Sequence, residues 1–489
     1  MILLALAAAV AQPSPVVRTD DGPVRGETLA GGSAVFRGIR FAAAPDGPLR
    51  WRAPRRPARW TAAVDAIRPH AACPQPDYGE WNRAASESGK EDCLFLDIRT
   101  PRLAASAKLP VLVWIHGGAN RGGAGGGTVE STITDGGIVL VSIQYRLGAL
   151  GFMSHPALSA EQGGPSGNYG LMDQQAALDW VRRNIARFGG DPAKVTIAGG
   201  SAGAQDVGLQ MLSPGARGLF AQAIEQSGTA GFGVAPRTLA QNEGVGTLIA
   251  SKAGLPPAVS AAGLRAVPVE RLLAAQEAVD VPDLDDDSFI WLQAVVDGRV
   301  LRETPAAALA AGRINPARTI SGVNAIELSL HGGLPAARAT VAREFGSQAD
   351  RALVLYGLQP GGTPVADPRL GDVTAQLAND LTFRCPTVAV SQRLTAHGLP
   401  VWQYQFDHAA PGGGVTHGGE LSSVFNVVPG APLRAYWTNF VRTGDPNGAG
   451  LPNWPRYDVK ERGYLSFGQD GPVATRDLRG DICGLRDTP

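Results

Sequence analysis

Continuous apolar runs bounded by glycine or proline recur along the chain and predict buried strands. The clearest runs cover residues 111–115, 138–143, 195–197 and 401–406, and β-branched residues are common in them. Because their polarity does not alternate, these runs are typical of strands that are covered on both faces.

A helical pattern lies between two of these runs, over residues 173–188. Its apolar residues recur at spacings of three and four, namely Leu178, Val181, Ile185 and Phe188. This spacing predicts an amphipathic helix that ends at Gly189 and Gly190, before the chain turns into the next strand. Strands that alternate with such helices indicate an α/β sheet with right-handed crossovers.

Residues 238–311 show a different pattern, of helical stretches rich in alanine, leucine and valine. Since this segment lies between core strands, we expect it to form a helical cap over a substrate pocket. Its acidic stretch, residues 280–287, is interpreted as solvated surface because the spacing does not match an EF-hand.

The chain begins with an apolar segment, residues 1–11, that ends in Ala9-Val10-Ala11. It resembles the apolar part of a secretory signal with a small-residue cleavage site, although it is short and no basic residue precedes it. We therefore expect a secreted or periplasmic protein, or a cytoplasmic one if this segment is not a signal. No segment reaches the about 20 apolar residues that span a bilayer, so no integral membrane domain is expected.

Four cysteines are present, and spacing alone does not choose among their three pairings. Cys73 and Cys93 are close in sequence, whereas Cys385 and Cys483 are far apart. In an exported chain, a Cys73–Cys93 disulfide would stabilise the fold by about 3 kcal/mol. In the cytosol, four reduced thiols are expected. No CxxC motif or Cys/His cluster suggests zinc, so we expect no metal.

Composition narrows the classes of function. The 489 residues include 44 basic and 44 acidic side chains, so the net charge at pH 7 is zero. Such a chain has no broad electrostatic field for nucleic acid or anionic membranes. With 44% hydrophobic and 18% charged residues, it is expected to be globular rather than disordered.

The segment Gly199-Gly200-Ser201-Ala202-Gly203 fits the pattern G-x-S-x-G. A buried strand is predicted before it, and a helix over residues 202–212 is predicted after it. A strand-to-helix turn this sharp presents a serine in a strained, exposed conformation, and the helix directs its N-terminal amides toward a developing anion. Ser201 is therefore the candidate nucleophile, and the alternative is a glycine-rich structural turn.

A second glycine-rich turn, His116-Gly117-Gly118-Ala119, follows the strand predicted at 111–115. Backbone N–H groups exposed in such a turn are the donors that a tetrahedral oxyanion needs, and the alternative is an ordinary tight turn. The glycine-rich run at residues 122–127 lacks the GK[ST] of a phosphate loop, so nucleotide binding is not expected.

Together with further motifs, these features resemble the type-B carboxylesterases, the family of the cholinesterases and bacterial para-nitrobenzyl esterases. The matching segments are EDCLFLD (91–97), GNYGLMDQ (167–174), ARFGGDP (186–192), YWTNF (436–440) and TGDPN (443–447). The resemblance implies a single α/β-hydrolase domain over residues 12–489, with a large, mostly parallel sheet flanked by helices. It also implies a small-molecule ester substrate and no metal or organic cofactor.

The resemblance assigns a Ser-His-Glu triad around Ser201. Glu327 ends the segment GVNAIE (322–327), which resembles the one that carries the family's triad acid. His417 lies in GGGVTHGGEL (412–421), which resembles the loop with the catalytic histidine, and the order Ser, Glu, His agrees with this fold. His408 is the main rival as base, and His331 lies close to Glu327 in sequence.

Five supporting positions also follow from the resemblance. The oxyanion donors map onto the amides of Gly118, Ala119 and Ala202. Ser227 and Glu420 match positions that support the base in the family.

Four positions depart from the family pattern. Gly200 stands where glutamate is usual, and this removes a negative charge that would favour the imidazolium. Asp206 stands where serine is common, and it either restores charge nearby or faces solvent. Asn120 and Arg121 stand where an aromatic residue is common, and they make the acyl side of the pocket more polar. We hypothesise that Arg121 favours esters with a carboxylate in the acyl group, the alternative being a surface arginine.

The sequence thus predicts a serine carboxylic-ester hydrolase that acts on small or medium esters through an acyl-enzyme. The alternatives are hydrolysis of amides, carbamates or lactones by the same triad, and a catalytically silent binding protein on the same fold. The sequence makes no prediction of the oligomeric state.

Overall fold

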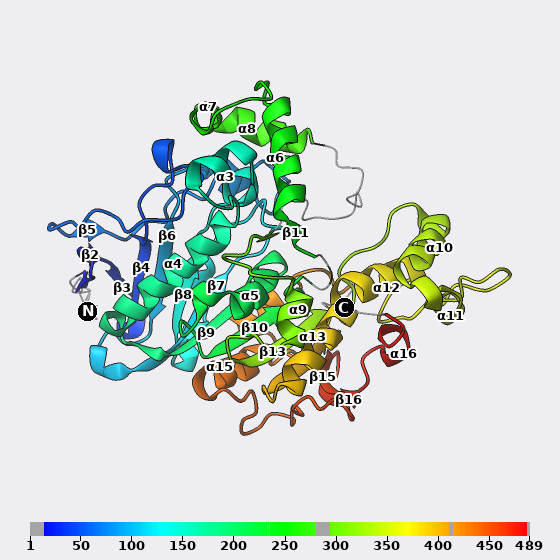
Figure 1. The fold of residues 1–489 in the computed structure, drawn as a ribbon. Coiled ribbons are helices and arrows are strands. Elements are labelled where there is room, and N and C mark those ends of the chain that lie inside the picture. The colour runs from blue at the N-terminus through cyan, green and yellow to red at the C-terminus, as the bar shows by residue number, and fades with distance from the viewer. Residues whose placement is uncertain (1–13, 232, 234, 280–293, 410–413, 487–489) are drawn as a thin grey trace, which may run out of the picture.

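The computed structural model describes residues 14–231, 233, 235–279, 294–409 and 414–486. The segment 1–11, interpreted as a signal, and the acidic stretch 280–287 lie outside the described residues. Among the described residues, the main sheet has 11 strands in the order β16-β15-β14-β13-β10-β9-β7-β8-β6-β4-β3 (Figure 1). These strands are β3 (Glu27–Thr28), β4 (Ala34–Arg40), β6 (Phe95–Thr100), β7 (Leu109–Ile115), β8 (Val139–Ile143), β9 (Gly190–Gly200), β10 (Gln222–Gln226), β13 (Arg318–Asn324), β14 (Val401–Phe406), β15 (Gly463–Gly468) and β16 (Gly471–Arg476).

The centre of the sheet is parallel and its two edges are antiparallel. All neighbours from β8 through β7, β9, β10, β13 and β14 to β15 pair in parallel. The pairs β15–β16, β8–β6, β6–β4 and β4–β3 are antiparallel. The four apolar runs fall on β7, β8, β9 and β14, so the predicted α/β fold with a mostly parallel sheet is confirmed.

The helices that matter for the site follow the central strands. They are α2 (Gly148–Phe152), α4 (Tyr169–Asn184), α5 (Ala202–Leu212), α6 (Leu239–Lys252), α7 (Ala261–Arg265), α8 (Val269–Glu277), α9 (Pro305–Ala310), α12 (Val373–Asn379), α13 (Cys385–Ala396), α14 (Leu421–Phe425) and α15 (Leu433–Thr443). The helix predicted at 173–188 begins earlier, at Tyr169, because residues 169–171 continue its buried face. It ends in the 3₁₀ turn Ile185–Phe188, and Gly189 caps this turn with a φ of 89°.

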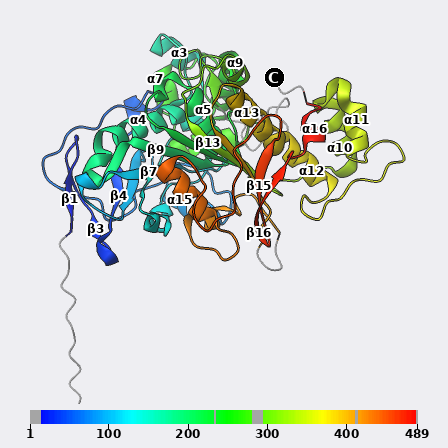
Figure 2. The ribbon, with the colours of Figure 1, turned by 90° about the horizontal axis from the view of Figure 1, so that it is seen from below.

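The sheet divides the core into two layers. Along β7, Val111, Val113 and Ile115 pack on one face with residues of α4 and α5. The intervening Leu112 and Trp114 pack on the other face with residues of α14 and α15. Figure 2 shows α15 on the opposite side of the sheet from α4 and α5. Both faces are covered, which explains why the strands read as continuous apolar runs.

Two further elements extend this core. As the helical pattern predicts, the described part of residues 238–311 contains α6 to α9. The helices α10 (Gly333–Glu344), α11 (Ala349–Leu355) and α16 (Gly480–Cys483) gather at one side of the molecule (Figures 1 and 2).

Both pairs of cysteines form disulfides. Cys73 is bonded to Cys93, which is one of the three pairings that the sequence allows, and Cys385 is bonded to Cys483. The second bond ties the start of α13 to α16. A search of the described helices finds none with the length and apolar character needed to cross a membrane.

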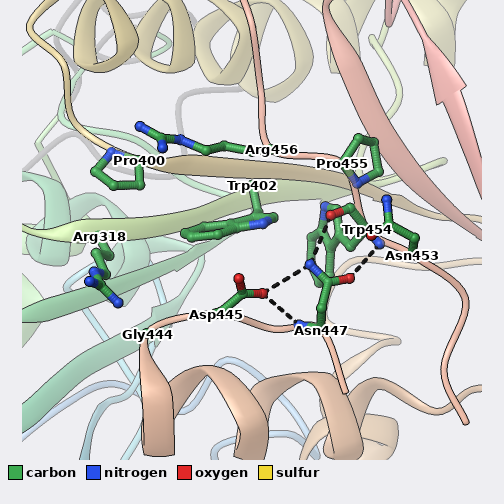
Figure 3. A pocket seen from close by; sticks show the side chains of 10 residues that line it. All are labelled: Arg318, Pro400, Trp402, Gly444, Asp445, Asn447, Asn453, Trp454, Pro455 and Arg456. Atoms are coloured by element: carbon green, nitrogen blue, oxygen red, sulfur yellow. Dashed lines mark hydrogen bonds between the residues drawn. The ribbon is translucent and has the colours of Figure 1, made fainter. Parts of the chain in front are cut away.

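A pocket of about 340 Å³ lies at the amino ends of β13 and β14 (Figure 3). Arg318 starts β13 and Pro400 directly precedes β14, and the side chain of Trp402 lies between them and Asp445 (Figure 3). Ser201 and Glu327 follow the carboxyl ends of their strands, so this pocket lies at the opposite edge of the sheet from them.

Candidate active site

Ser201 occupies a sharp turn between β9 and α5. Its φ of 55° and ψ of −127° lie outside the regions that non-glycine residues normally adopt. Gly203 allows the turn to pack against β7, because a Cβ there would lie 2.2 Å from the carbonyl oxygen of Ile115. The Ser201 N–H donates to the carbonyl oxygen of Gln226 at 2.8 Å. The predicted strand–turn–helix is thus present, and it holds the serine in a strained conformation.

His417 and Glu327 are hydrogen-bonded to each other. His417 Nδ1 lies 2.7 Å from Glu327 Oε2, the Glu327 side chain is fully buried, and 31% of the His417 side chain is exposed. The second carboxylate oxygen of Glu327 accepts the N–H of Asn324 at 2.6 Å. A buried carboxylate on Nδ1 leaves the other ring nitrogen, Nε2, as the one that can take up a proton.

Buried amide side chains hold the loop that carries Glu327. Asn379, at the end of α12, accepts the N–H groups of both Glu327 and Leu328 through Oδ1, at 2.9 Å each. Its Nδ2 donates to the carbonyl oxygens of Leu328 at 3.2 Å and Ala375 at 2.7 Å. The Asn379 side chain therefore joins this loop to α12.

Glu420 connects the loops of Ser201, Glu327 and His417. Its Oε1 accepts Gln226 Nε2 at 3.0 Å, and the carbonyl oxygen of Gln226 in turn accepts the Ser201 N–H. Its Oε2 accepts Asn324 Nδ2 at 2.6 Å, and this nitrogen also donates to the carbonyl oxygen of Thr416, next to His417. The three loops therefore share one hydrogen-bond network at the carboxyl edge of the parallel sheet.

The electrostatics of this network favour a protonated imidazole. Burial lowers the pKa of His417, but the hydrogen bond and charge of Glu327, with the charge of Glu420, outweigh it and raise the pKa above its usual value. Burial, together with the nearby charge of Glu327, raises the pKa of Glu420. The site thus stabilises the cation that forms when His417 accepts a proton.

The glycine-rich turn after β7 packs directly against Ser201. Three successive residues have positive φ: Gly118 at 111°, Ala119 at 55° and Asn120 at 54°. A Cβ on Gly117 would lie 2.5 Å from the carbonyl oxygen of Gly200 and 3.1 Å from Ser201 Cβ. Within the described part of the chain, the amides of Gly118 and Ala119 donate to no acceptor, and Ala202 begins α5 with an N–H that the helix leaves unpaired. These amides are available to an oxyanion.

Ser227 lies beside the turn of Ser201, since a Cβ on the next residue, Gly228, would lie 2.3 Å from the Ser201 carbonyl oxygen. It has a φ of 56° and is buried, and its N–H donates to the carbonyl oxygen of Gly322 at 2.8 Å. Its hydroxyl has no hydrogen-bond partner among the residues that the structure describes.

Comparison with known proteins decides the family. The model of the carboxylesterase family matches residues 13–354 and 365–483. The chain belongs to the carboxylesterase family. It is 32% identical to fumonisin B1 esterase of Sphingopyxis macrogoltabida, over 95% of this chain and 88% of that protein. It is 33% identical to carboxylesterase 1D of Rattus norvegicus, over 97% and 94% of the two chains.

Solved structures agree with this assignment. A PNB esterase superimposes with a TM-score of 0.82 at 28% identity, covering 97% of this chain and 100% of that one. The Geobacillus stearothermophilus carboxylesterase EST55 gives a TM-score of 0.80 at 31% identity, over 96% and 100% of the two chains. This carboxylesterase therefore has the α/β-hydrolase fold and is a carboxylic-ester hydrolase, and the alternative of a silent binding protein is set aside.

Two positions that depart from the family pattern contact each other in this carboxylesterase. Asp206 is fully buried, so the alternative that it faces solvent is wrong. Its Oδ1 accepts Asn120 Nδ2 at 3.1 Å, and its Oδ2 accepts Gln174 Nε2 at 2.6 Å. Asn120 is 1% exposed, so its side chain points into the protein and not toward solvent.

Arg121 already has a carboxylate neighbour. Its guanidinium lies 4.0 Å from Glu277, at the end of α8, and 5.0 Å from the ring centre of Tyr78. The Tyr78 hydroxyl donates to the same glutamate at 2.8 Å. Arg121 is therefore part of a contact between the glycine-rich turn and the helical segment, rather than a surface arginine in a loop.

His408, the main rival as base, has a different neighbour. His408 Nδ1 is 3.4 Å from the carbonyl oxygen of Gly468, and His331 is exposed on the surface. His116 is buried, and burial lowers its pKa to about 4. Across the described ranges, no group of three or more His, Cys, Asp or Glu side chains could hold a metal ion.

Sequence reasoning missed the amides that organise the site. Gln226, Asn324 and Asn379 are completely or almost completely buried polar residues at the ends of β10, β13 and α12. The strands β10 (QAIEQ) and β13 (RTISGVN) contain several polar residues besides Gln226 and Asn324, so no local apolar pattern singled out these two amides.

Proposed function

We propose that this carboxylesterase hydrolyses small or medium esters through Ser201, His417 and Glu327, by way of an acyl-enzyme. His417 Nε2 takes the proton of Ser201 Oγ while this oxygen attacks the ester carbonyl carbon, and then gives the proton to the departing alcohol. Water releases the acid by the same steps. The observation that carries the proposal is the 2.7 Å bond between His417 and the buried Glu327, in loops tied to the strained Ser201.

The amides of Gly118, Ala119 and Ala202 are proposed to bind the oxyanion of the tetrahedral intermediate. Their location beside Ser201 and their lack of acceptors within the described residues support this role. Glu420 is proposed to support His417 by stabilising its cation, and Ser227 to support the turn of Ser201.

We also propose export of the protein and one catalytic domain over residues 12–489. The two disulfides fit an oxidising compartment. We also keep the hypothesis that Arg121 selects acyl carboxylates, and such a group would bind beside Glu277, which lies 4.0 Å from the guanidinium. An unchanged preference between anionic and neutral esters in Arg121→Ala would reject it.

Labelling with a fluorophosphonate tests the triad. Wild type should be labelled, and S201A should not. Hydrolysis of phenyl acetate should fall by about 10⁴-fold or more in S201A and H417A. It should fall by about 10⁴-fold in E327Q, since glutamine cannot stabilise the imidazolium. His408→Ala is the matched control and should keep nearly full activity. Equal labelling of S201A, or loss of activity in H408A, would overturn the assignment.

A further inference from the structure

A buried polar cluster lies beneath the glycine-rich turn. It consists of Asn120, Tyr145, Gln174 and Asp206, and we call it the Asp206 cluster. Each of its members is buried, with at most 1% exposure. It connects the turn to the segment after β8, to α4 and to α5. None of the roles proposed above uses it.

The Asp206 cluster holds Asn120, the third residue of the turn with a positive φ. Asn120 Nδ2 donates to Asp206 at 3.1 Å, and Asn120 Oδ1 lies 3.1 Å from the Tyr145 hydroxyl. The carbonyl oxygen of Asn120 accepts the N–H of Gly148 at 2.7 Å. The Tyr145 hydroxyl has a single hydrogen, which Asn120 Oδ1 and the carbonyl oxygen of His116, 2.7 Å away at the start of the turn, share. Successive non-glycine residues with positive φ persist only where their surroundings hold them, and these contacts do so.

The orientation of the amides around Asp206 is fixed from one side. Gln210 Nε2 donates to the carbonyl oxygen of Leu171 at 3.1 Å, and also to Gln174 Oε1 at 2.9 Å. Because Gln174 Oε1 is taken, its Nε2 must face Asp206. One oxygen of the carboxyl group therefore always meets a donor, and a proton on Asp206 has to sit on the oxygen that faces Asn120.

Two hydrogen-bond patterns satisfy this cluster. With Asp206 ionised, Asn120 donates to the carboxylate in a charge-assisted bond. With Asp206 protonated, Asn120 has to turn its amide over, accept the carboxyl proton, and donate to the Tyr145 oxygen. The second pattern contains only neutral bonds, which are roughly half as strong. The turn is consequently held more firmly when Asp206 is ionised.

We propose that Asp206 and Asn120 are a positioning pair for the oxyanion turn, and that ionisation of Asp206 switches the turn to its firmly held form. The proposal rests on the proposed function, and it deepens that function by adding a pH control to the same site. The pair consists of two of the four positions that depart from the family pattern, and they are hydrogen-bonded to each other.

The surroundings of Asp206 support a transition near neutral pH. Burial raises the pKa of Asp206 to about 7, although the bonds from Gln174 and Asn120 lower it. No cation lies within 4 Å of Asp206 in the described part of the chain. Titratable groups also occur on the elements around it: His116, Tyr145, the paired Arg146 and Asp173, Tyr169, Asp179, Arg182 and Arg183 on α4, Asp191 and Lys194 on β9, Glu225 on β10, and, next to Asn120, Arg121.

Most of these groups keep their charge across the relevant range. His116 is neutral because burial lowers its pKa to about 4, and burial raises the pKa of Tyr145 well above its usual value. Glu225 meets α5 at Gly208, and burial raises its pKa to about 8. Glu225 therefore also titrates in this range, and the comparison of D206N with wild type separates the two groups because both proteins retain Glu225.

The test is a pH profile of kcat and KM for phenyl acetate between pH 5.5 and 8.5. The variants are D206N, N120A and the double variant, all in the full chain. At pH 8, each single variant should lower kcat about tenfold with KM within about threefold, since a displaced oxyanion turn acts on the transition state. The double variant should be no more than about threefold worse than the worse single one.

The pH dependence distinguishes this pair from a merely structural one. At pH 6, where Asp206 of wild type is mostly protonated, the kcat of D206N should be within about twofold of the wild-type kcat. A deficit that is equal at both pH values, or single-variant losses that multiply in the double variant, would overturn the proposal. If D206N does not fold, the profile of N120A decides, because it should lose the same ionisation from kcat.

A different result would show that the proposed function, rather than the positioning pair, is wrong. If hydrolysis by wild type does not depend on Ser201, the proposed function fails. The pair is then tested through the urea midpoints of the same four proteins at pH 6 and pH 8. Coupling between the two substitutions should appear at pH 8 and be smaller at pH 6. Absence of coupling at both values would overturn the pair itself.

Discussion

Glu225 is expected to make the stability of this carboxylesterase fall as pH rises. The residue lies on β10 and is 1% exposed, and its Oε2 accepts the Ser321 hydroxyl at 3.1 Å. Its Oε1 has no partner among the described residues. Burial raises its pKa from 4.5 to about 8, against the smaller effect of the Ser321 bond. The native state therefore keeps a proton that the unfolded chain loses.

The magnitude follows from proton linkage. Between pH 4.5 and pH 8 the unfolded state binds fewer protons than the native state, so the free energy of unfolding falls with rising pH. Each pH unit in this interval costs up to about 1.4 kcal/mol, which gives about 3 kcal/mol by pH 7. Glu225→Gln keeps the shape of the side chain and removes this proton. Its advantage over wild type should therefore grow with pH and level off above pH 8.

Urea unfolding, followed by tryptophan fluorescence from pH 5 to pH 9, measures this difference. The free energy of unfolding of E225Q, minus that of wild type, should rise by about 1.4 kcal/mol per pH unit between pH 5 and pH 8. Glu270→Gln is the control, because Glu270 is exposed on α8, and it should change stability by no more than about 0.5 kcal/mol. A constant difference between E225Q and wild type across the whole range would refute the reasoning.

Two further predictions concern the turn of Ser201 and the disulfide between Cys385 and Cys483. Gly203→Ala should lower kcat by about 100-fold, since its Cβ would meet a carbonyl oxygen of β7 at 2.2 Å and displace the turn of Ser201. Gly164→Ala meets nothing within 4 Å and should leave kcat unchanged, so an equal loss in both would contradict this account. Replacing Cys385 and Cys483 by serine removes a disulfide between residues 98 positions apart. This should lower the free energy of unfolding by about 4–5 kcal/mol. An unchanged urea midpoint would show that this link does not restrict the unfolded chain.

The elements of the sheet were predictable where burial alone determines the sequence. The strand β14, Val401–Phe406, has the predicted bounds because all its residues are buried. The strand β9 begins at Gly190, five residues before the predicted start, because residues 192–194 are exposed and give no apolar signal. Of the missed part only Gly190 pairs with β7, and the regular pairing resumes at Val195, so pattern reasoning finds the part of the strand that is both buried and regularly paired.

The residues around Ser201 were predictable to different degrees. The turn itself has a local signature, because glycine is required wherever a Cβ would meet a neighbouring backbone. Glu327 has no such signature and was assigned only through the family resemblance. The bonds from Gln226 to Glu420 and from Asn120 to Asp206 join residues 194 and 86 positions apart. Only the folded topology brings such partners together, so no local pattern encodes them.

The buried ionisable groups set stability and activity against each other. Three buried carboxyls have a raised pKa, namely Asp206, Glu225 and Glu420. Within the described residues, none of them has a cation within 4 Å. Each therefore lowers the free energy of unfolding as pH rises from its unfolded pKa to its native pKa. His417 acts in the same direction, because its raised native pKa stabilises the fold below its unfolded value of 6.5 and this gain is lost as pH rises through the native pKa. The proposed chemistry needs the opposite charge states, a neutral His417 and an ionised Asp206. The same burial that shapes the site therefore places its active form on the alkaline side of the pH at which the fold is most stable.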